Sequence, residues 1–187
     1  MAKLGVFNSI SIDGFFTDDK SDMSWAHASA PDPEFNQFVS NNASHDGILL
    51  FGRKTYEMMA AYWPTPQAMK DMPAVAKGMN SMQKVVFSET LKEASWENTR
   101  LFRGNLVEEV KNLKSQSEKD IVILGSGSIA SQLAEARLID QYQMVVVPIL
   151  LGKGRTQFEG VTHHQNLLLT ESRSFRKGNI FLSYSVN

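Results

Sequence analysis

Short apolar runs alternate along this chain with segments whose apolar residues recur every three or four positions. The compact runs, bounded by glycine or polar residues, predict buried β-strands. They are Leu4–Ile12, Gly47–Phe51, Lys84–Phe87 and residues 120–125. The segments with helical spacing are "DPEFNQFVSNN", "RKTYEMMAAYW", "NLVEEVKNLKS" and Ser128–Ala136. Asp32 can cap the first of these helices, because Asp accepts N–H groups at a helix start.

The last third of the chain predicts further strands. The segment "QYQMVVVPILLG" is a strand that Pro148 interrupts, and Leu167–Ser174 and Asn179–Val186 form an antiparallel pair. The polar stretch Asp18–Pro33 predicts a loop. Strands that alternate with helices indicate a mostly parallel sheet covered on both faces, and the terminal pair adds an antiparallel edge. No repeat or linker interrupts the sequence, so we expect a single domain over residues 1–187.

Composition narrows the classes of protein. Lys plus Arg number 19 and Asp plus Glu 20, so the chain lacks the basic excess of a general nucleic-acid binder. The absence of cysteine excludes disulfides, thiolate catalysis and Cys-based metal sites. The N-terminus lacks the pattern of a signal peptide, and no run approaches the roughly 18 apolar residues that cross a bilayer. We therefore expect a cytoplasmic protein that does not bind membranes.

The first candidate site is the strand-to-helix junction "LLFGRKTYE". Gly52 ends the predicted strand, and Arg53, Lys54 and Thr55 occupy the first helical turn. Unpaired backbone N–H groups and the helix dipole attract phosphate at such a position. The two basic side chains and the Thr55 hydroxyl would strengthen that attraction. The alternative is an ordinary helix start with two solvated basic residues.

The second candidate site is "VILGSGSIA", where Gly125, Gly127 and Ala130 match the G-x-G-x-x-A spelling of a dinucleotide-binding turn. Glycine would let the backbone approach a ligand closely, and Ser128 can cap the helix. The alternative is a tight turn that only connects strand to helix. A Rossmann domain is excluded, because the following strand ends at Pro148 without the expected ribose-binding acid.

Both junctions can serve one ligand if their helices start on the same parallel sheet. One helix N-terminus would hold the pyrophosphate of a dinucleotide and the other its adenosine phosphates. Arg53 and Lys54 would favour a 2′-phosphate, which predicts NADPH over NADH. Ser88, after the strand "KVVF", could add a hydroxyl to the same phosphate.

In this order, the motifs "SISIDGFF", "GRKTYE", "VVFS", "ILGSGSIASQLAEARLID" and "VVVPILLGKGRTQFEG" resemble the dihydrofolate reductase-like superfamily. Within it they are similar to the branch of the RibD C-terminal reductase domain. The resemblance implies a three-layer αβα fold with a mixed sheet that is mostly parallel and has an antiparallel C-terminal edge. It also implies NADPH as hydride donor, a flat nitrogen heterocycle as acceptor, and a homodimer to which "QMVVVPILL" could contribute.

The resemblance assigns the cofactor residues by motif. They are Ile12, Asp13 and Gly14 beside the nicotinamide, then Gly52, Arg53, Lys54, Thr55 and Ser88, and finally Gly125, Gly127, Ser128 and Ile129. The last three of these would open the helix that receives the pyrophosphate. The segment "GRTQF" resembles the family's Gly-Asp-Thr-x-Phe, with Arg155 in place of the acid.

On the substrate side, "MSWAHASAPDPEF" resembles a Met-Pro-Trp segment and the helix after it, which carries a carboxylate for the heterocycle. Glu34 matches that carboxylate best and Asp32 is the second candidate; Trp25 and Phe38 are the candidates for substrate contact. The alternative for Glu34 is favourable placement in the first turn of a helix. The branch usually has a lysine where this chain has Phe7.

The resemblance implies reduction of 5-amino-6-(5-phosphoribosylamino)uracil, with dihydrofolate reduction as the alternative. A non-catalytic NADPH-binding regulatory protein is the alternative from another class. No metal is required for any of these activities. His163 and His164 are adjacent in the sequence and no clear third ligand accompanies them, so we do not expect a metal site there.

Overall fold

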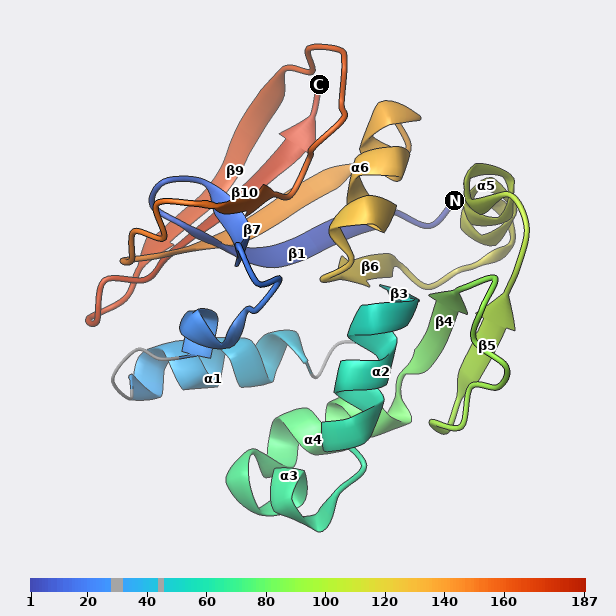
Figure 1. Ribbon diagram of the computed structural model, residues 1–187, viewed down its shortest axis with the longest axis horizontal. Coiled ribbons are helices and arrows are strands. Elements are labelled where there is room, and N and C mark those ends of the chain that lie inside the picture. Colours follow the sequence, from blue (N-terminus) through green and yellow to red (C-terminus); the bar gives the residue numbers. More distant parts are fainter. Residues whose placement is uncertain (28–31, 44–45) are drawn as a thin grey trace.

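An eight-stranded sheet lies at the centre of the computed structural model, which describes residues 1–27, 32–43 and 46–187 (Figure 1). Its strands are β1 (Leu4–Ser11), β3 (Ile48–Gly52), β4 (Gln83–Phe87), β5 (Thr99–Phe102), β6 (Ile121–Leu124), β7 (Gln141–Val147), β9 (Leu167–Ser174) and β10 (Ile180–Val186). Their order across the sheet is β5-β4-β3-β6-β1-β7-β10-β9. The pairs from β5 to β7 are parallel, whereas β10 is antiparallel to both β7 and β9.

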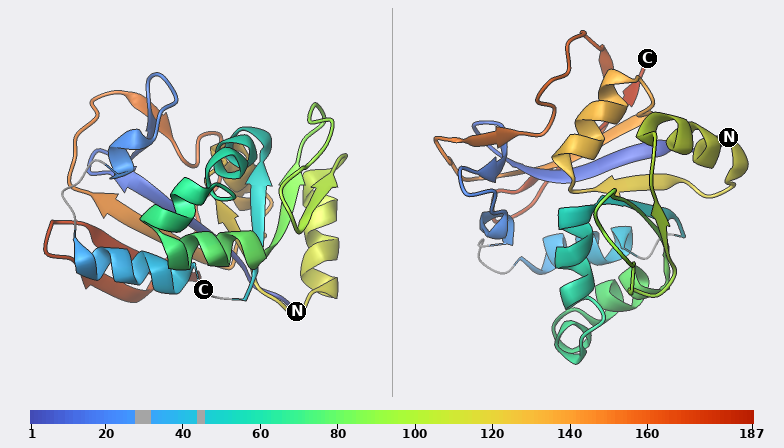
Figure 2. Two further views of the ribbon diagram at one scale, coloured as in Figure 1. Left: turned by 90° about the horizontal axis from the view of Figure 1, so that it is seen from below. Right: turned by 45° about the vertical axis from the view of Figure 1, so that its right-hand side comes forward.

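Helices cover both faces of the sheet. Their bounds are α1 (Pro33–Asn42), α2 (Arg53–Tyr62), α3 (Pro66–Asp71), α4 (Pro73–Ser81), α5 (Leu106–Gln116) and α6 (Gly127–Glu135). Leu133 of α6 and Val110 of α5 pack on Leu50 and Val6 of the sheet, which places these two helices on one face. Tyr56 of α2 and Met79 of α4 pack with Phe51 and Val86, and Phe38 of α1 packs with Phe181. Helices α1, α2 and α4 therefore lie on the other face (Figure 2). The predicted three-layer αβα architecture, with its antiparallel C-terminal edge, is confirmed.

Several elements were not predicted, and local packing explains them. Pro66 and Pro73 each stand at the start of a short helix, so the chain after α2 forms α3 and α4. The predicted loop Asp18–Pro33 contains a 3-10 turn, η1 (Ser24–His27), and its residues 28–31 lie outside the described part of the chain. A second, two-stranded sheet pairs β2 (Phe15–Asp18) with β8 (Gly154–Thr156). In the described ranges, no helix combines the length and apolarity needed to cross a bilayer.

Lys84 is the first residue of a strand that the sequence predicts to be buried, and the structure places this charged side chain inside the core. It is fully buried, and its Nζ donates to the carbonyl oxygens of Met79, Asn80 and Met82 at 2.8, 3.2 and 2.7 Å. The same nitrogen lies 4.5 Å from the centre of the Trp96 ring. The ammonium group therefore caps the carboxyl end of α4, where unpaired carbonyl groups and the helix dipole favour a cation.

This buried lysine predicts a pH dependence of stability. Burial lowers the pKa of Lys84 from 10.5 to about 8, so between these values the unfolded chain binds more protons than the folded one. The contribution of Lys84 to the free energy of unfolding therefore rises with pH from about 8 to 10.5. We expect the difference between wild type and Lys84→Met to shift in favour of wild type across that interval, as measured by chemical denaturation at several pH values. Parallel pH profiles for the two proteins would contradict the assignment.

Candidate cofactor site

The two glycine junctions of the sequence meet at one edge of the sheet. Gly52 ends β3 and Gly125 follows β6, and these strands are parallel neighbours. Ser88 follows β4 on one side, and Ile12 follows β1 on the other. Four adjacent parallel strands therefore present their carboxyl ends in a row, which is where α/β sheets bind ligands (Figure 1).

Hydrogen bonds join the two junctions directly. The N–H of Gly52 donates to Oγ of Ser126 at 2.6 Å, and the N–H of Ser126 donates to Oγ1 of Thr55 at 3.1 Å. The two hydroxyl oxygens lie 3.0 Å apart. The start of α2 is thus fixed against the start of α6, and Thr55 uses the hydroxyl that we predicted for a phosphate to hold this contact.

The same contact explains the glycine at position 125. Gly125 has φ +61°, and a Cβ there would lie 2.7 Å from Cγ2 and 2.9 Å from Oγ1 of Thr55. At Gly127, a Cβ would lie 3.3 Å from the ring of Phe16 in β2. Both glycines were predicted to make room for a ligand, but in the structure they make room for protein side chains.

The capping of α6 also differs from the prediction that Ser128 caps this helix. Ser126, not Ser128, is the N-cap; it has φ +56° and makes no side-chain capping bond, while Ser128 is exposed on the first turn. The N–H of Ile129 donates to the Ser126 carbonyl at 2.9 Å, and the Ile129 side chain lies in the core. The backbone donors that α6 can offer to an anion are therefore those of Gly127 and Ser128, because the first N–H groups of a helix have no acceptor within it.

Asn8 is a residue of this site that the sequence analysis missed. It is buried in the middle of β1, where its Oδ1 accepts the N–H of Gly125 at 2.7 Å and its Nδ2 contacts the Gly125 carbonyl at 3.5 Å. A side-chain amide thus fixes the turn between β6 and α6 from the neighbouring strand. The signal in the sequence was a polar residue within an otherwise buried strand.

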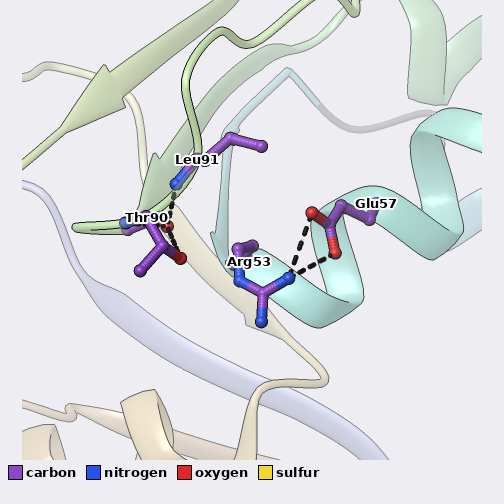
Figure 3. A network of polar contacts seen from close by, with 5 residues as sticks. Arg53, Glu57, Thr90 and Leu91 are labelled. Atoms are coloured by element: carbon purple, nitrogen blue, oxygen red, sulfur yellow. Dashed lines mark hydrogen bonds and ion pairs between the residues drawn. The ribbon is translucent and has the colours of Figure 1, made fainter.

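A groove of about 740 Å³ lies between the first turns of α2 and the loop after β4. It is lined by Arg53, Glu57, Thr90, Leu91, Lys92, Glu93 and Ser95. Oγ of Ser88 accepts the N–H groups of Thr90 and Leu91 at 3.1 and 2.9 Å, so the predicted ligand residue shapes the wall of this groove (Figure 3). Lys54 is exposed on the first turn of α2. The loop residues were not predicted, because only folding brings them beside Arg53, whereas Glu57 lies one helical turn after Arg53 and was overlooked.

The turn after β1 holds the residues predicted to lie beside the nicotinamide. Ile12 is 60% exposed, and Gly14 has φ +84°. The carboxylate of Asp13 accepts the N–H groups of Leu151 and Gly152, and hydrogen bonds from Ser11 and then Gly152 lower its pKa. Asp13 therefore fastens this turn to the segment after β7, which leaves Ile12 as the exposed apolar side chain at the edge.

Arg155 stands where the family pattern has an acid. It lies in β8, and its guanidinium bonds to Glu159 at 3.1 Å. Because β8 pairs with β2, the "GRTQF" segment covers the residues that follow the turn after β1. Lys153 and Asp19 form an ion pair across the same two-stranded sheet.

The carboxylate of Asp32 caps α1. It accepts the N–H groups of Glu34, Phe35 and Lys177 at 3.1, 3.3 and 3.0 Å. Burial raises its pKa, but these N–H groups outweigh burial, so the net pKa is lowered and Asp32 is ionised at neutral pH. Glu34 forms an ion pair with Arg173 at 2.7 Å on a half-exposed surface. Asp32 is therefore a structural cap, and a proton-donating role for either acid stays a prediction.

Trp25 and Phe38 lie in a hydrophobic cluster under β7 and β10. Each side chain is 8% exposed, and the Phe38 ring lies 4.7 Å from that of Phe181. The indole Nε1 of Trp25 donates to the Asp22 carbonyl at 3.2 Å. These two predicted substrate contacts are core residues in the structure: Phe38 is on the apolar face of α1, and Trp25 of η1 packs in the same cluster with residues of β7 and β10.

The paired histidines are separated by the fold. Nδ1 of His163 lies 3.2 Å from Glu135 at the end of α6, while His164 is exposed. Within residues 1–27, 32–43 and 46–187, no three His, Asp or Glu side chains come together as a metal-binding group.

Comparison with known proteins identifies the class. The structure matches a dihydrofolate reductase from Enterococcus faecalis in complex with NADP(H) and RAB-propyl, with a TM-score of 0.61, 16% identity and coverage of 99% of this chain and 96% of that one. The chain therefore has a dihydrofolate reductase-like fold. It matches the RibD C-terminal domain over residues 2–181, and so it belongs to that family.

Other relatives support the same placement. A protein from Shewanella sp. PV-4, named provisionally for riboflavin biosynthesis, matches with a TM-score of 0.75 and 21% identity over 100% of this chain and 99% of that one. A pyrimidine reductase-like protein from Corynebacterium diphtheriae matches with a TM-score of 0.63 and 15% identity, over 100% of this chain and 92% of that one. The uncharacterized protein YyaP of Bacillus subtilis is 28% identical over 180 residues, which is 96% of this chain and 92% of that protein.

Proposed function

We propose that this protein is an NADPH-dependent reductase of a pyrimidine- or pteridine-like substrate. The observation that carries the proposal is the contact between two helix N-termini, made through Ser126, with Arg53 and Lys54 beside it. One such N-terminus binds one phosphate group, whereas two side by side match the separated phosphates of a dinucleotide. NADPH supplies a hydride when it is bound.

The residues present fit this cofactor. Neither α2 nor α6 has a side-chain cap, so the first N–H groups of both helices remain available to phosphate. In the proposed arrangement, the N–H groups of Gly127 and Ser128 bind the pyrophosphate. Arg53, Lys54 and the groove beside them bind the 2′-phosphate.

The substrate side of the proposal rests on the exposed side chain of Ile12 and on the acid of α1. Glu34 is the candidate for the proton side, because Asp32 is committed to three backbone N–H groups. Phe7, in place of the family lysine, packs 6.4 Å from Phe181 and offers no cation to a substrate phosphate. Reduction of 5-amino-6-(5-phosphoribosylamino)uracil is the named activity that the family supports, with dihydrofolate reduction as the alternative.

A binding experiment tests the proposal. NADPH and NADH are titrated separately, and binding is followed by nucleotide fluorescence and by the shift in melting temperature. We expect tighter binding of NADPH; no binding of either would reject the enzyme and the sensor alike. Turnover is then measured with dihydrofolate and with the phosphoribosylaminouracil. Binding of NADPH without turnover on either would favour another substrate or a regulatory protein.

We also propose a homodimer in the cytoplasm. The edge strand β9 and the neighbouring β10 carry exposed apolar side chains on one sheet face, Leu167, Leu169 and Ile180, and such patches mark protein–protein contacts. The segment "QMVVVPILL" was also predicted to contribute to the dimer interface, but its Val145 is buried within the protomer.

We expect light scattering to give the mass of a dimer, and Leu169→Glu to give a monomer, because a buried unpaired carboxylate opposes association. Leu168 is 56% exposed on the opposite face, so Leu168→Glu is the matched control and should remain dimeric. Dimers of unchanged stability in Leu169→Glu would refute this surface.

A further inference from the structure

The groove beside α2 carries as many acids as bases. Its charged side chains are Arg53, Lys92, Glu57 and Glu93. A site selected only for a 2′-phosphate would present a surplus of positive charge, because that group carries close to two negative charges at neutral pH. Lys54 beside the groove adds one base, so the two acids offset most of the positive charge and limit the preference for a phosphorylated ribose.

Glu57 is the acid in direct contact with the predicted phosphate ligand. Its two oxygens lie 3.2 and 2.9 Å from Nη1 of Arg53, one turn further along α2 (Figure 3). Both contacts use the same guanidinium nitrogen, and Nε and Nη2 have no acceptor among the described residues. Arg53 is thus held in the groove with part of its hydrogen-bonding capacity free for a ligand.

We infer that Glu57 determines cofactor specificity by offsetting the charge of Arg53, so that NADH competes with NADPH for this site. The inference rests on the proposed function and names a residue that sets how strongly the site prefers NADPH over NADH. A carboxylate beside the guanidinium repels a 2′-phosphate, whereas it can accept a hydrogen bond from the neutral 2′-hydroxyl of NADH.

Glu57 also orients Arg53, and the two effects oppose each other. The pair is half exposed, with side-chain exposures of 41% and 46%, and an exposed i,i+4 pair contributes little to ordering. The phosphate dianion carries two negative charges, and the Glu57 carboxylate repels both of them. Repulsion therefore outweighs orientation, and removal of the charge should favour NADPH.

The test compares Glu57→Gln with wild type. Glutamine keeps the side-chain volume and an acceptor for Arg53, so only the charge is lost. We expect the ratio of NADPH to NADH affinity to rise about fivefold, mainly through NADPH, and the rise to shrink at high salt. Glu108→Gln is the matched control, because Glu108 forms a similar exposed helical pair with Lys111 at 3.0 Å on α5 and does not line the groove.

A second pair of ligands separates this inference from the proposed function. Adenosine 2′,5′-bisphosphate and 5′-AMP differ only in the 2′-phosphate and report on the groove without the nicotinamide. The same rise in their affinity ratio for Glu57→Gln supports the role of Glu57 even if neither dinucleotide binds, in which case the reductase proposal alone fails. An unchanged or lower ratio for Glu57→Gln, with wild type binding the ligands, overturns the role of Glu57 and leaves the reductase proposal intact.

Discussion

Replacement of Gly125 with alanine should destabilise the protein and weaken its binding of NADPH together. Alanine at φ +61° is strained by about 1–3 kcal/mol, and its Cβ would lie 2.7 Å from Cγ2 of Thr55. Relief of that contact moves the start of α6 away from the start of α2, with a further cost of about 1–3 kcal/mol. We expect a loss of about 2–6 kcal/mol in the free energy of unfolding. Displacement of the Gly127 and Ser128 donors should lower NADPH affinity by about tenfold or more, as for one lost charge-assisted bond.

Two variants separate backbone strain from the contact with Thr55. Gly160 has φ +90°, and a Cβ at this position would meet no atom within 4 Å, so Gly160→Ala carries strain alone and should leave cofactor affinity unchanged. Thr55→Ser removes Cγ2 and keeps the hydroxyl. The double variant Gly125→Ala with Thr55→Ser should therefore regain part of the NADPH affinity that Gly125→Ala loses. Chemical denaturation and NADPH titration measure the two effects. Wild-type NADPH affinity in a folded Gly125→Ala protein would show that the junction is not the cofactor site.

Replacement of Arg53 with alanine should weaken NADPH far more than NADH. A hydrogen bond to a charged group contributes about 1.5–3 kcal/mol, which corresponds to a loss of about ten- to a hundredfold in NADPH affinity. The variant also leaves Glu57 in the groove without its partner at 2.9 Å. NADH lacks the 2′-phosphate, so its affinity should change little. Titration of both cofactors measures the difference, and equal losses would count against a 2′-phosphate role.

The double variant Arg53→Ala with Glu57→Gln isolates the loss of the guanidinium from the exposed carboxylate. Its NADPH affinity should lie between those of wild type and Arg53→Ala, because the repelling charge is gone but the phosphate donor is not restored. Lys111→Ala removes an exposed helical cation that pairs with Glu108 on α5, and it should leave both affinities unchanged. An effect of Lys111→Ala as large as that of Arg53→Ala would indicate a general charge effect.

The sequence predicted the sheet and the meeting of its two glycine junctions well. The apolar runs before Gly52 and Gly125 are strands, and both junctions lie at the carboxyl edge. This success has a physical cause, because buried parallel strands read as apolar runs and all end at one edge of the sheet. The structure gives Gly125 a reason that the sequence did not supply: a Cβ there would meet Thr55 of the other junction.

The substrate side was predicted less well. The motif placed Trp25 and Phe38 against a substrate, but both pack inside the aromatic cluster. Asp32 was assigned a catalytic role; the structure shows that it caps α1, and the catalytic role stays a prediction. Aromatic residues at helical spacing and an acid before a helix have a structural use in many folds, so their types alone did not distinguish the two uses.

The sequence by itself determined the α/β class, the two helix starts on one sheet and the positive charge of Arg53 and Lys54, because periodicity, glycine and charge are local properties of the chain. Only the tertiary structure decided that Asn8 and Thr55 hold the turn between β6 and α6 and that Glu57 faces a loop about 35 residues further on, as the lining of the groove shows. Hydrogen bonds and charge balance between distant segments depend on which strands become neighbours. That choice is made by packing of the whole sheet and leaves no local pattern in the sequence.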